Sequence, residues 1–95
     1  MDFGFEGELV EWRGPAPYHF VDIPEELGED IKAAATGLEY WGQIPVVVRI
    51  EGTDFTTALF PREGRYLLPV KDAVRKPLGL TVGEVVAVEM SVGRR

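Results

Sequence analysis

Cysteine is absent from this sequence, and histidine occurs once, as His19. The chain therefore has no disulfide framework, no thiolate nucleophile and no cysteine-based zinc site, and a single histidine excludes a two-histidine metal pair. We expect no cofactor and no metal. No apolar run approaches the roughly 18 residues of a membrane span, and the first residues carry neither a basic region nor an apolar signal core. These absences predict a cytoplasmic protein with no membrane partner.

Basic residues are also few, because ten Lys and Arg stand against sixteen acids and the net charge is −6. A protein that neutralises nucleic-acid phosphates is expected to be basic, so this composition disfavours nucleic acid as a partner. The imbalance is uneven: residues 1–30 hold nine acids and one base, whereas residues 61–95 hold four acids and seven bases. The basic last third is therefore the part of the chain in which to look first for an anion site.

The chain has 95 residues, 45% of them hydrophobic, which predicts one small globular domain over residues 1–95. Eleven glycines and seven prolines separate short alternating runs, a pattern typical of a strand-rich protein. We expect turns at residues 52–54 and 61–64. Pro24 is expected to open a first helix, and Pro69 and Pro77 to open and end a second. The predicted strands cover residues 3–12, 18–23, 42–51, 55–60, 66–68 and 85–92.

A near-repeat links the two halves of the chain. In each half a short strand leads to a proline, a helix, a glycine and a valine-rich strand, with Pro24 and Gly42 in the first half and Pro69 and Gly83 in the second. The prolines precede their glycines by 18 and 14 residues, so the spacing is unequal and chance similarity is the alternative. A true repeat predicts a mostly β, double-split barrel with pseudo-two-fold symmetry and two short helices. Such a barrel closes within one chain, which predicts a monomer, with a dimer as the alternative.

Several sequence blocks occur together over most of the chain. They are G-x-x-F at residues 52–55, P-x-x-G-x-Y-x-L-P-V-K at residues 61–71, and V-R-K at residues 74–76. With these blocks the sequence resembles the bacterial domain of unknown function numbered 1905. The resemblance implies a small double-split β-barrel and brings no established reaction, ligand or catalytic residue.

A fainter likeness runs through residues 68–89. Pro69, Arg75, Leu78-Gly79-Leu80 and Gly83-Glu84 resemble the swapped-hairpin DNA-binding domains of the AbrB and MazE class, although Glu84 stands where that pattern has Asp. The likeness implies a nucleic-acid-binding or transcription-regulating barrel, which is our alternative function. The predicted first helix argues against it, because its acids would repel one DNA backbone. Those acids are Glu25, Glu26, Glu29 and Asp30.

Lys71, Arg75 and Lys76 form a basic cluster at the predicted second helix, where a small anion could be held, with Arg62 and Arg65 as possible neighbours. The alternative is that they solvate the surface or pair with the acidic first half. The acids of the first helix could attract a divalent cation, but compensation of the helix dipole and solvation explain them more simply. His19 lacks an evident nucleophile, and the sole serine lies near the chain end, so we predict no catalytic residue.

Four aromatic residues flank the predicted strands: Trp12, Tyr18, Tyr40 and Trp41. We expect them to pack in the core, and the alternative is a binding site at the barrel mouth near Trp41. The sequence thus favours a non-enzymatic binding or interaction module for an unknown small ligand or protein partner. The predicted site combines Lys71, Arg75 and Lys76 with Trp41.

Overall fold

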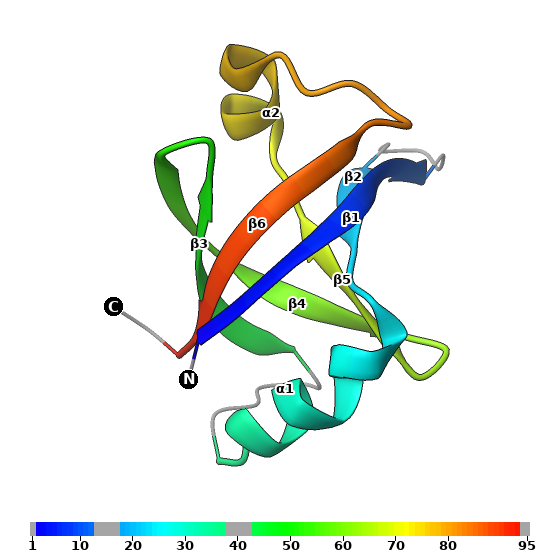
Figure 1. The fold of residues 1–95 in the computed structure, drawn as a ribbon, viewed down its shortest axis with the longest axis vertical. Coiled ribbons are helices and arrows are strands. Elements are labelled where there is room, and N and C mark those ends of the chain that lie inside the picture. The colour runs from blue at the N-terminus through cyan, green and yellow to red at the C-terminus, as the bar shows by residue number, and fades with distance from the viewer. Residues whose placement is uncertain (1, 13–17, 38–42, 94–95) are drawn as a thin grey trace.

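A computed structural model describes residues 2–12, 18–37 and 43–93, which form a closed antiparallel barrel (Figure 1). The elements are β1 (Asp2–Trp12), β2 (Tyr18–Asp22), a 3-10 turn η1 (Glu25–Leu27), α1 (Gly28–Ala34), β3 (Ile44–Ile50), β4 (Thr53–Arg62), β5 (Arg65–Pro69), α2 (Asp72–Leu78) and β6 (Val85–Val92). Around the barrel the strands follow the order β1-β2-β5-β4-β3-β6. The predicted mostly β barrel with two short helices is confirmed.

The two halves of the chain are related by a pseudo-two-fold axis, as the pairing register shows. If β1, β2 and β3 are exchanged with β4, β5 and β6, every pair of neighbouring strands becomes another neighbouring pair. Matching pairs are Val10↔Phe20 with Phe60↔Leu67, and Phe5↔Val88 with Phe55↔Val48. Arg49 and Glu89 are equivalent residues that pair with each other, so the axis passes between them. The near-repeat is therefore real at the level of strand pairing.

The core is formed by alternate strand residues and closed by the helical segments. The interior side chains are apolar and at most 9% exposed. Those fully buried in the strands include Leu9, Val21, Ile44, Val46, Val48, Ile50, Leu59 and Leu68. Helices α1 and α2 lie at opposite ends of the molecule (Figure 1), where Ile31 and Leu80 are buried. Because apolar side chains stabilise a fold when removed from water, this alternation accounts for the strand pattern of the sequence.

The second helix differs from its prediction at both ends. Pro69 is the last residue of β5, and α2 begins at Asp72, so the proline does not open the helix. Pro77 lies inside α2, which ends at Leu78 with Gly79 as its C-cap, at a φ of 68°. There the Leu80 N–H donates to the Arg75 carbonyl at 3.1 Å, the long closing bond of a Schellman motif.

Within the described ranges, no helix is long and apolar enough to cross a membrane.

Two tight hairpins among the described residues each use a Glu-Gly turn. Glu51 and Gly52 have φ values of 48° and 80°, and Glu63 and Gly64 have values of 50° and 78°. Two successive residues with positive φ are typical of a type I′ turn, whose twist matches that of the flanking strands. The first turn therefore begins at Glu51, one residue before the predicted position.

Candidate functional site

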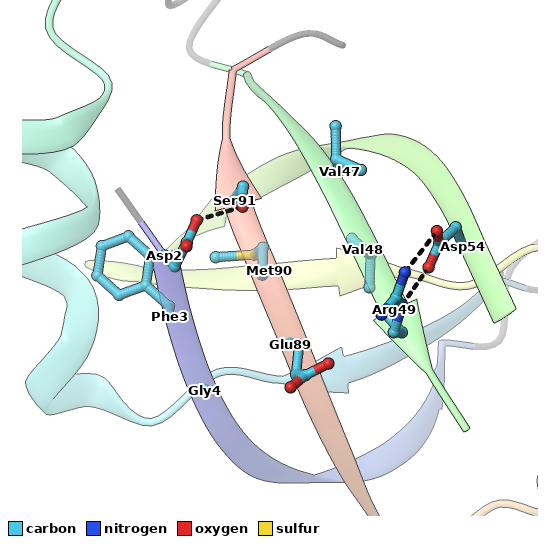
Figure 2. Close-up of a pocket in the computed structure, with 10 residues that line it drawn as sticks. All are labelled: Asp2, Phe3, Gly4, Val47, Val48, Arg49, Asp54, Glu89, Met90 and Ser91. Atoms are coloured by element: carbon cyan, nitrogen blue, oxygen red, sulfur yellow. Dashed lines mark hydrogen bonds and ion pairs between the residues drawn. The ribbon is translucent and has the colours of Figure 1, made fainter. Parts of the chain in front are cut away.

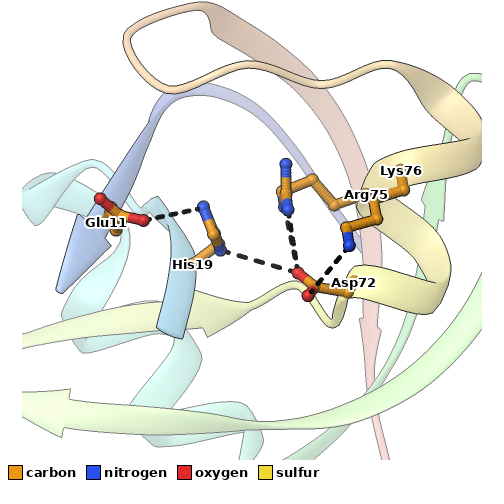
Figure 3. A network of polar contacts seen from close by, with 5 residues as sticks. All are labelled: Glu11, His19, Asp72, Arg75 and Lys76. Carbon is orange, nitrogen blue, oxygen red and sulfur yellow. Dashed lines mark hydrogen bonds and ion pairs between the residues drawn. The ribbon is translucent and has the colours of Figure 1, made fainter. Parts of the chain in front are cut away.

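The predicted basic cluster on α2 is part of a polar network (Figure 3). Arg75 donates to one carboxylate oxygen of Asp72 from Nε at 3.3 Å and from a terminal nitrogen at 3.0 Å. Lys76 Nζ lies 3.9 Å from the other oxygen. The hydrogen bond from Arg75 holds the pKa of Asp72 below its usual value. The positive charge of this cluster is thus offset in part by a carboxylate on the same helix.

His19 joins this network to the barrel. Its side chain is 11% exposed, with Nε2 lying 3.5 Å from a carboxylate oxygen of Glu11 and Nδ1 lying 3.9 Å from one of Asp72. The hydroxyl of Ser91 instead donates to Asp2, where β6 pairs with β1. The structure therefore places the histidine beside two carboxylates, one of which also binds Arg75, and not beside the serine.

The other residues of the predicted anion site lie in different places. Lys71 is the N-cap of α2, with an extended backbone, and Trp41 lies outside the described residues. Arg62 and Arg65 lie on the β4–β5 hairpin next to α1, at the opposite end of the molecule from α2 (Figure 1). The expectation that they are neighbours of the α2 cluster is therefore wrong. Anion binding by Lys71, Arg75 and Lys76 stays a prediction.

A hollow of about 480 Å³ lies between α1 and the β4–β5 hairpin, and we call it the α1 hollow. Its charged lining residues are Lys32, Arg62, Arg65, Glu25, Glu29 and Glu63. Arg65 is held by the Asp22 carboxylate at 3.2 Å and by the Ile23 carbonyl at 3.3 Å. Its Nε is buried without a hydrogen-bond partner in the described structure. Although Glu25 and Glu29 line this hollow, no group of three or more His, Cys, Asp or Glu side chains in the described part of the chain is placed to hold a metal.

Four aromatic residues form a patch on the outer surface of the barrel, which we call the aromatic wall: Trp12, Tyr18, Phe20 and Phe60. Trp12 is 48% exposed, Tyr18 56% and Phe60 38%. Phe20 is buried between two of them, with ring centroids 6.3 Å from Tyr18 and 6.5 Å from Phe60. The Arg62 guanidinium lies 5.1 Å from the centre of the Trp12 ring, a cation–π contact. The prediction that Trp12 and Tyr18 pack in the core is wrong, and Tyr40 lies outside the described residues, as Trp41 does.

The position of the aromatic wall follows from strand alternation. Leu9 faces the barrel interior, so Trp12, three residues later, faces outward. Val21 likewise faces inward, which directs Tyr18 outward, and Phe60 follows the buried Leu59. Sequence reasoning did not include Phe20 and Phe60 in a site. The signal was available, because a strand with large apolar residues at both odd and even positions cannot bury them all on one face.

A second outer surface, formed by β1, β6, β3 and β4, is acidic (Figure 2). Arg49 donates to the two Asp54 oxygens at 2.6 and 3.0 Å, and this contact, with Glu89 adding a smaller effect, raises the pKa of Arg49. Beside Glu89 lies Gly4, the residue equivalent to Asp54 under the pseudo-two-fold. A hollow of about 420 Å³ opens there.

Comparison with known proteins agrees with the resemblance that the sequence blocks suggested. The family model described as a domain of unknown function (DUF1905) matches residues 5–90. Those residues span most of β1 and β6 and all of the elements between them. A search of curated proteins found no match. The chain therefore belongs to the family of domains of unknown function numbered DUF1905.

Proposed function

We propose that this chain is a non-enzymatic binding module whose contact surface is the aromatic wall. The observation that carries the proposal is the exposure of Trp12, Tyr18 and Phe60 outside a core that is complete without them. Leaving apolar surface in water costs about 25 cal/mol per Å². Contiguous exposed apolar patches mark interaction sites, and Trp and Tyr are enriched among the residues that dominate binding energy.

The strands that carry the aromatic wall make it suitable for binding a partner. Its residues lie on β1, β2 and β4, which are paired on both sides in the closed barrel. Rings held by paired strands lose little conformational freedom when a partner binds, so less of the binding energy is offset. Because a closed barrel has no free sheet edge, a partner is expected to contact side chains rather than add a strand.

Cationic side chains border the aromatic wall on two sides. Arg62 stacks on Trp12 at one side. On the other side, Phe20 pairs with Pro69, and the Val70 N–H donates to the His19 carbonyl at 2.9 Å. Continuing this register brings Lys71 opposite Tyr18. A partner that is apolar and carries some negative charge would therefore complement the surface best.

Selection from a random peptide library displayed on phage, using the immobilised protein, tests the proposal. We expect the selected peptides, once synthesised, to bind the protein and to lose at least about tenfold in affinity with Trp12→Ala or Tyr18→Ala. Val85→Ala is the matched control, because Val85 is an apolar side chain, 65% exposed, outside the wall. The proposal fails if no peptide is enriched, or if binding is equally strong in all three variants.

A further inference from the structure

The α1 hollow exists because one half of the barrel lacks a side chain that the other half has. Pro24 and Lys71 are the N-caps of the equivalent helical segments η1–α1 and α2, which makes Gly28 the counterpart of Arg75. At the α2 end the Arg75 side chain is 19% exposed and binds Asp72, which also lies near His19. At the α1 end glycine leaves the corresponding space empty.

The shape of the hollow permits a side chain at Gly28, so the empty space is not imposed by the fold. A Cβ at Gly28 would have the Gly64 carbonyl oxygen as its nearest neighbour, at 3.8 Å, an ordinary contact. The backbone of Gly28 is helical, with a φ of −56°. Any residue adopts this conformation, and most would stabilise the helix relative to glycine.

The charged side chains that line the hollow balance one another, so one negative group can lie beside its cations but a row of negative groups cannot. Arg62 and Arg65 come from the hairpin and Lys32 from α1, and these cations are matched by three carboxylates. The buried Nε of Arg65 is a donor without an acceptor in the described structure. Leaving a buried donor unpaired destabilises the structure, and an acceptor oxygen that reached this nitrogen would remove the cost.

Arg62 connects the hollow to the aromatic wall, since the same side chain lines the hollow and stacks on Trp12. We propose that the α1 hollow binds a carboxylate of an apolar peptide segment that lies on the aromatic wall, with Arg62 and Arg65 contacting the carboxylate. This inference rests on the proposed function and names the chemistry of its partner. The carboxylate is that of an Asp or Glu side chain or of a free C-terminus.

A single-stranded nucleic acid is the competing occupant, because bases stack on exposed aromatic rings. It carries a negative charge on every nucleotide, and Glu25, Glu29 and Glu63 line the hollow where a phosphate would enter. The net charge of −6 adds to this repulsion. One carboxylate meets far less repulsion than a row of phosphates, so the charges favour the peptide.

Three synthetic hexapeptide bead libraries test the inference, each rich in apolar residues. The first contains no carboxylate, with amidated C-termini and no Asp or Glu. The second contains one Asp or Glu and an amidated C-terminus, and the third contains only a free C-terminal carboxylate. We expect binding beads to be at least about tenfold more frequent in the second or third library than in the first, since hydrogen bonds to charged groups are the stronger ones. The library with the greater yield identifies the source of the carboxylate.

Two variants test the part played by the hollow. Gly28→Gln places a side chain in the hollow, and Arg62→Gln removes an exposed cation that lines the hollow and stacks on Trp12. We expect each variant to bind carboxylate-containing peptides with an affinity about tenfold lower. Lys76→Gln is the charge-matched control, because Lys76 is 69% exposed at the opposite end of the molecule, and it should leave binding unchanged. Circular dichroism of each variant checks that the barrel is folded.

Different contrary results would overturn the hollow proposal alone or both proposals. If the carboxylate-free library yields as many binders and these require Trp12, the aromatic wall binds its partner but the hollow proposal is overturned. If Lys76→Gln weakens binding as much as Arg62→Gln, the carboxylate lies at α2 and the hollow proposal is also overturned. If no library yields a binder, both proposals fail. Binding of a dT12 oligonucleotide that requires both Trp12 and Arg62 would assign the surface to single-stranded nucleic acid instead.

Discussion

Gly7 occupies the part of β1 where this strand passes from pairing with β6 to pairing with β2. It pairs with Val86, and two residues later Leu9 pairs with Val21. A Cβ on Gly7 would lie 2.0 Å from the Asp22 carbonyl oxygen and 2.9 Å from Val21 Cγ1. Because real Cβ contacts are essentially never shorter than 3.0 Å, β1 and β2 would have to separate by about 1 Å. We predict that Gly7→Ala destabilises the barrel.

The magnitude follows from two opposing effects. Forcing extra atoms into a packed site costs about 1–3 kcal/mol, and more when the backbone must move. Replacing glycine by alanine within a strand recovers about 0.5–1 kcal/mol of conformational entropy. The free energy of unfolding should therefore fall by about 1–3 kcal/mol. In a domain of this size that corresponds to a Tm lower by about 5–20 °C.

Gly4→Ala in the same strand is the matched control, since a Cβ there has no heavy atom within 4 Å. Its free energy of unfolding should be unchanged or higher by about 0.5–1 kcal/mol. Thermal and urea unfolding followed by circular dichroism would measure both variants. If Gly7→Ala and Gly4→Ala unfold at the same temperature as the unmodified protein, the close approach of β1 to β2 is not as described.

Three further predictions concern the core, α1 and α2. Leu9→Ala and Leu59→Ala should each lower the free energy of unfolding in urea by about 2–5 kcal/mol, because these equivalent residues are fully buried; a loss below 1 kcal/mol in either would contradict their equivalence. Gly28→Ala should raise the free energy of unfolding by about 0.5–1 kcal/mol, and a lower Tm would refute this. In an NMR titration Asp72 should have a pKa below its usual value that rises in Arg75→Gln. Its contribution to stability is then full above the unfolded pKa and is lost as pH falls through the folded pKa.

Strand alternation was enough to predict the barrel. In β3 the alternation of Val46, Val48 and Ile50 with more exposed residues identifies one buried face, and β6 repeats the pattern. Because a one-residue shift would expose the whole apolar set, this pattern also restricts the register. The helix ends were harder, because proline is compatible with the last residue of β5 as well as with a helix start. The start of α2 at Asp72 depends on tertiary structure, which the sequence pattern does not show.

The candidate site was predicted less well, for a physical reason. The size of the aromatic residues favours the core, although alternation from Leu9 directs Trp12 outward. The contact between Arg62 and Trp12 joins residues 50 positions apart in the sequence and depends on how strongly the barrel coils. The α1 hollow exists because Gly28 has no side chain. This can be recognised only when the equivalent residue in the other half, Arg75, is known.

The molecule departs from its pseudo-two-fold symmetry most clearly at residues on the outside of the barrel. Several equivalent interior residues are both apolar, as with Phe5 and Phe55 or Leu9 and Leu59, because both halves contribute to one core. Equivalent outer residues differ in chemistry: Trp12 corresponds to Arg62, Gly28 to Arg75, Gly4 to Asp54 and Arg49 to Glu89. A packed barrel requires an apolar interior but places no such demand on the outer residues. The asymmetric residues include Trp12, Arg62 and Gly28, which define the wall and the hollow, so a partner that needs both can bind in one orientation and at one end only.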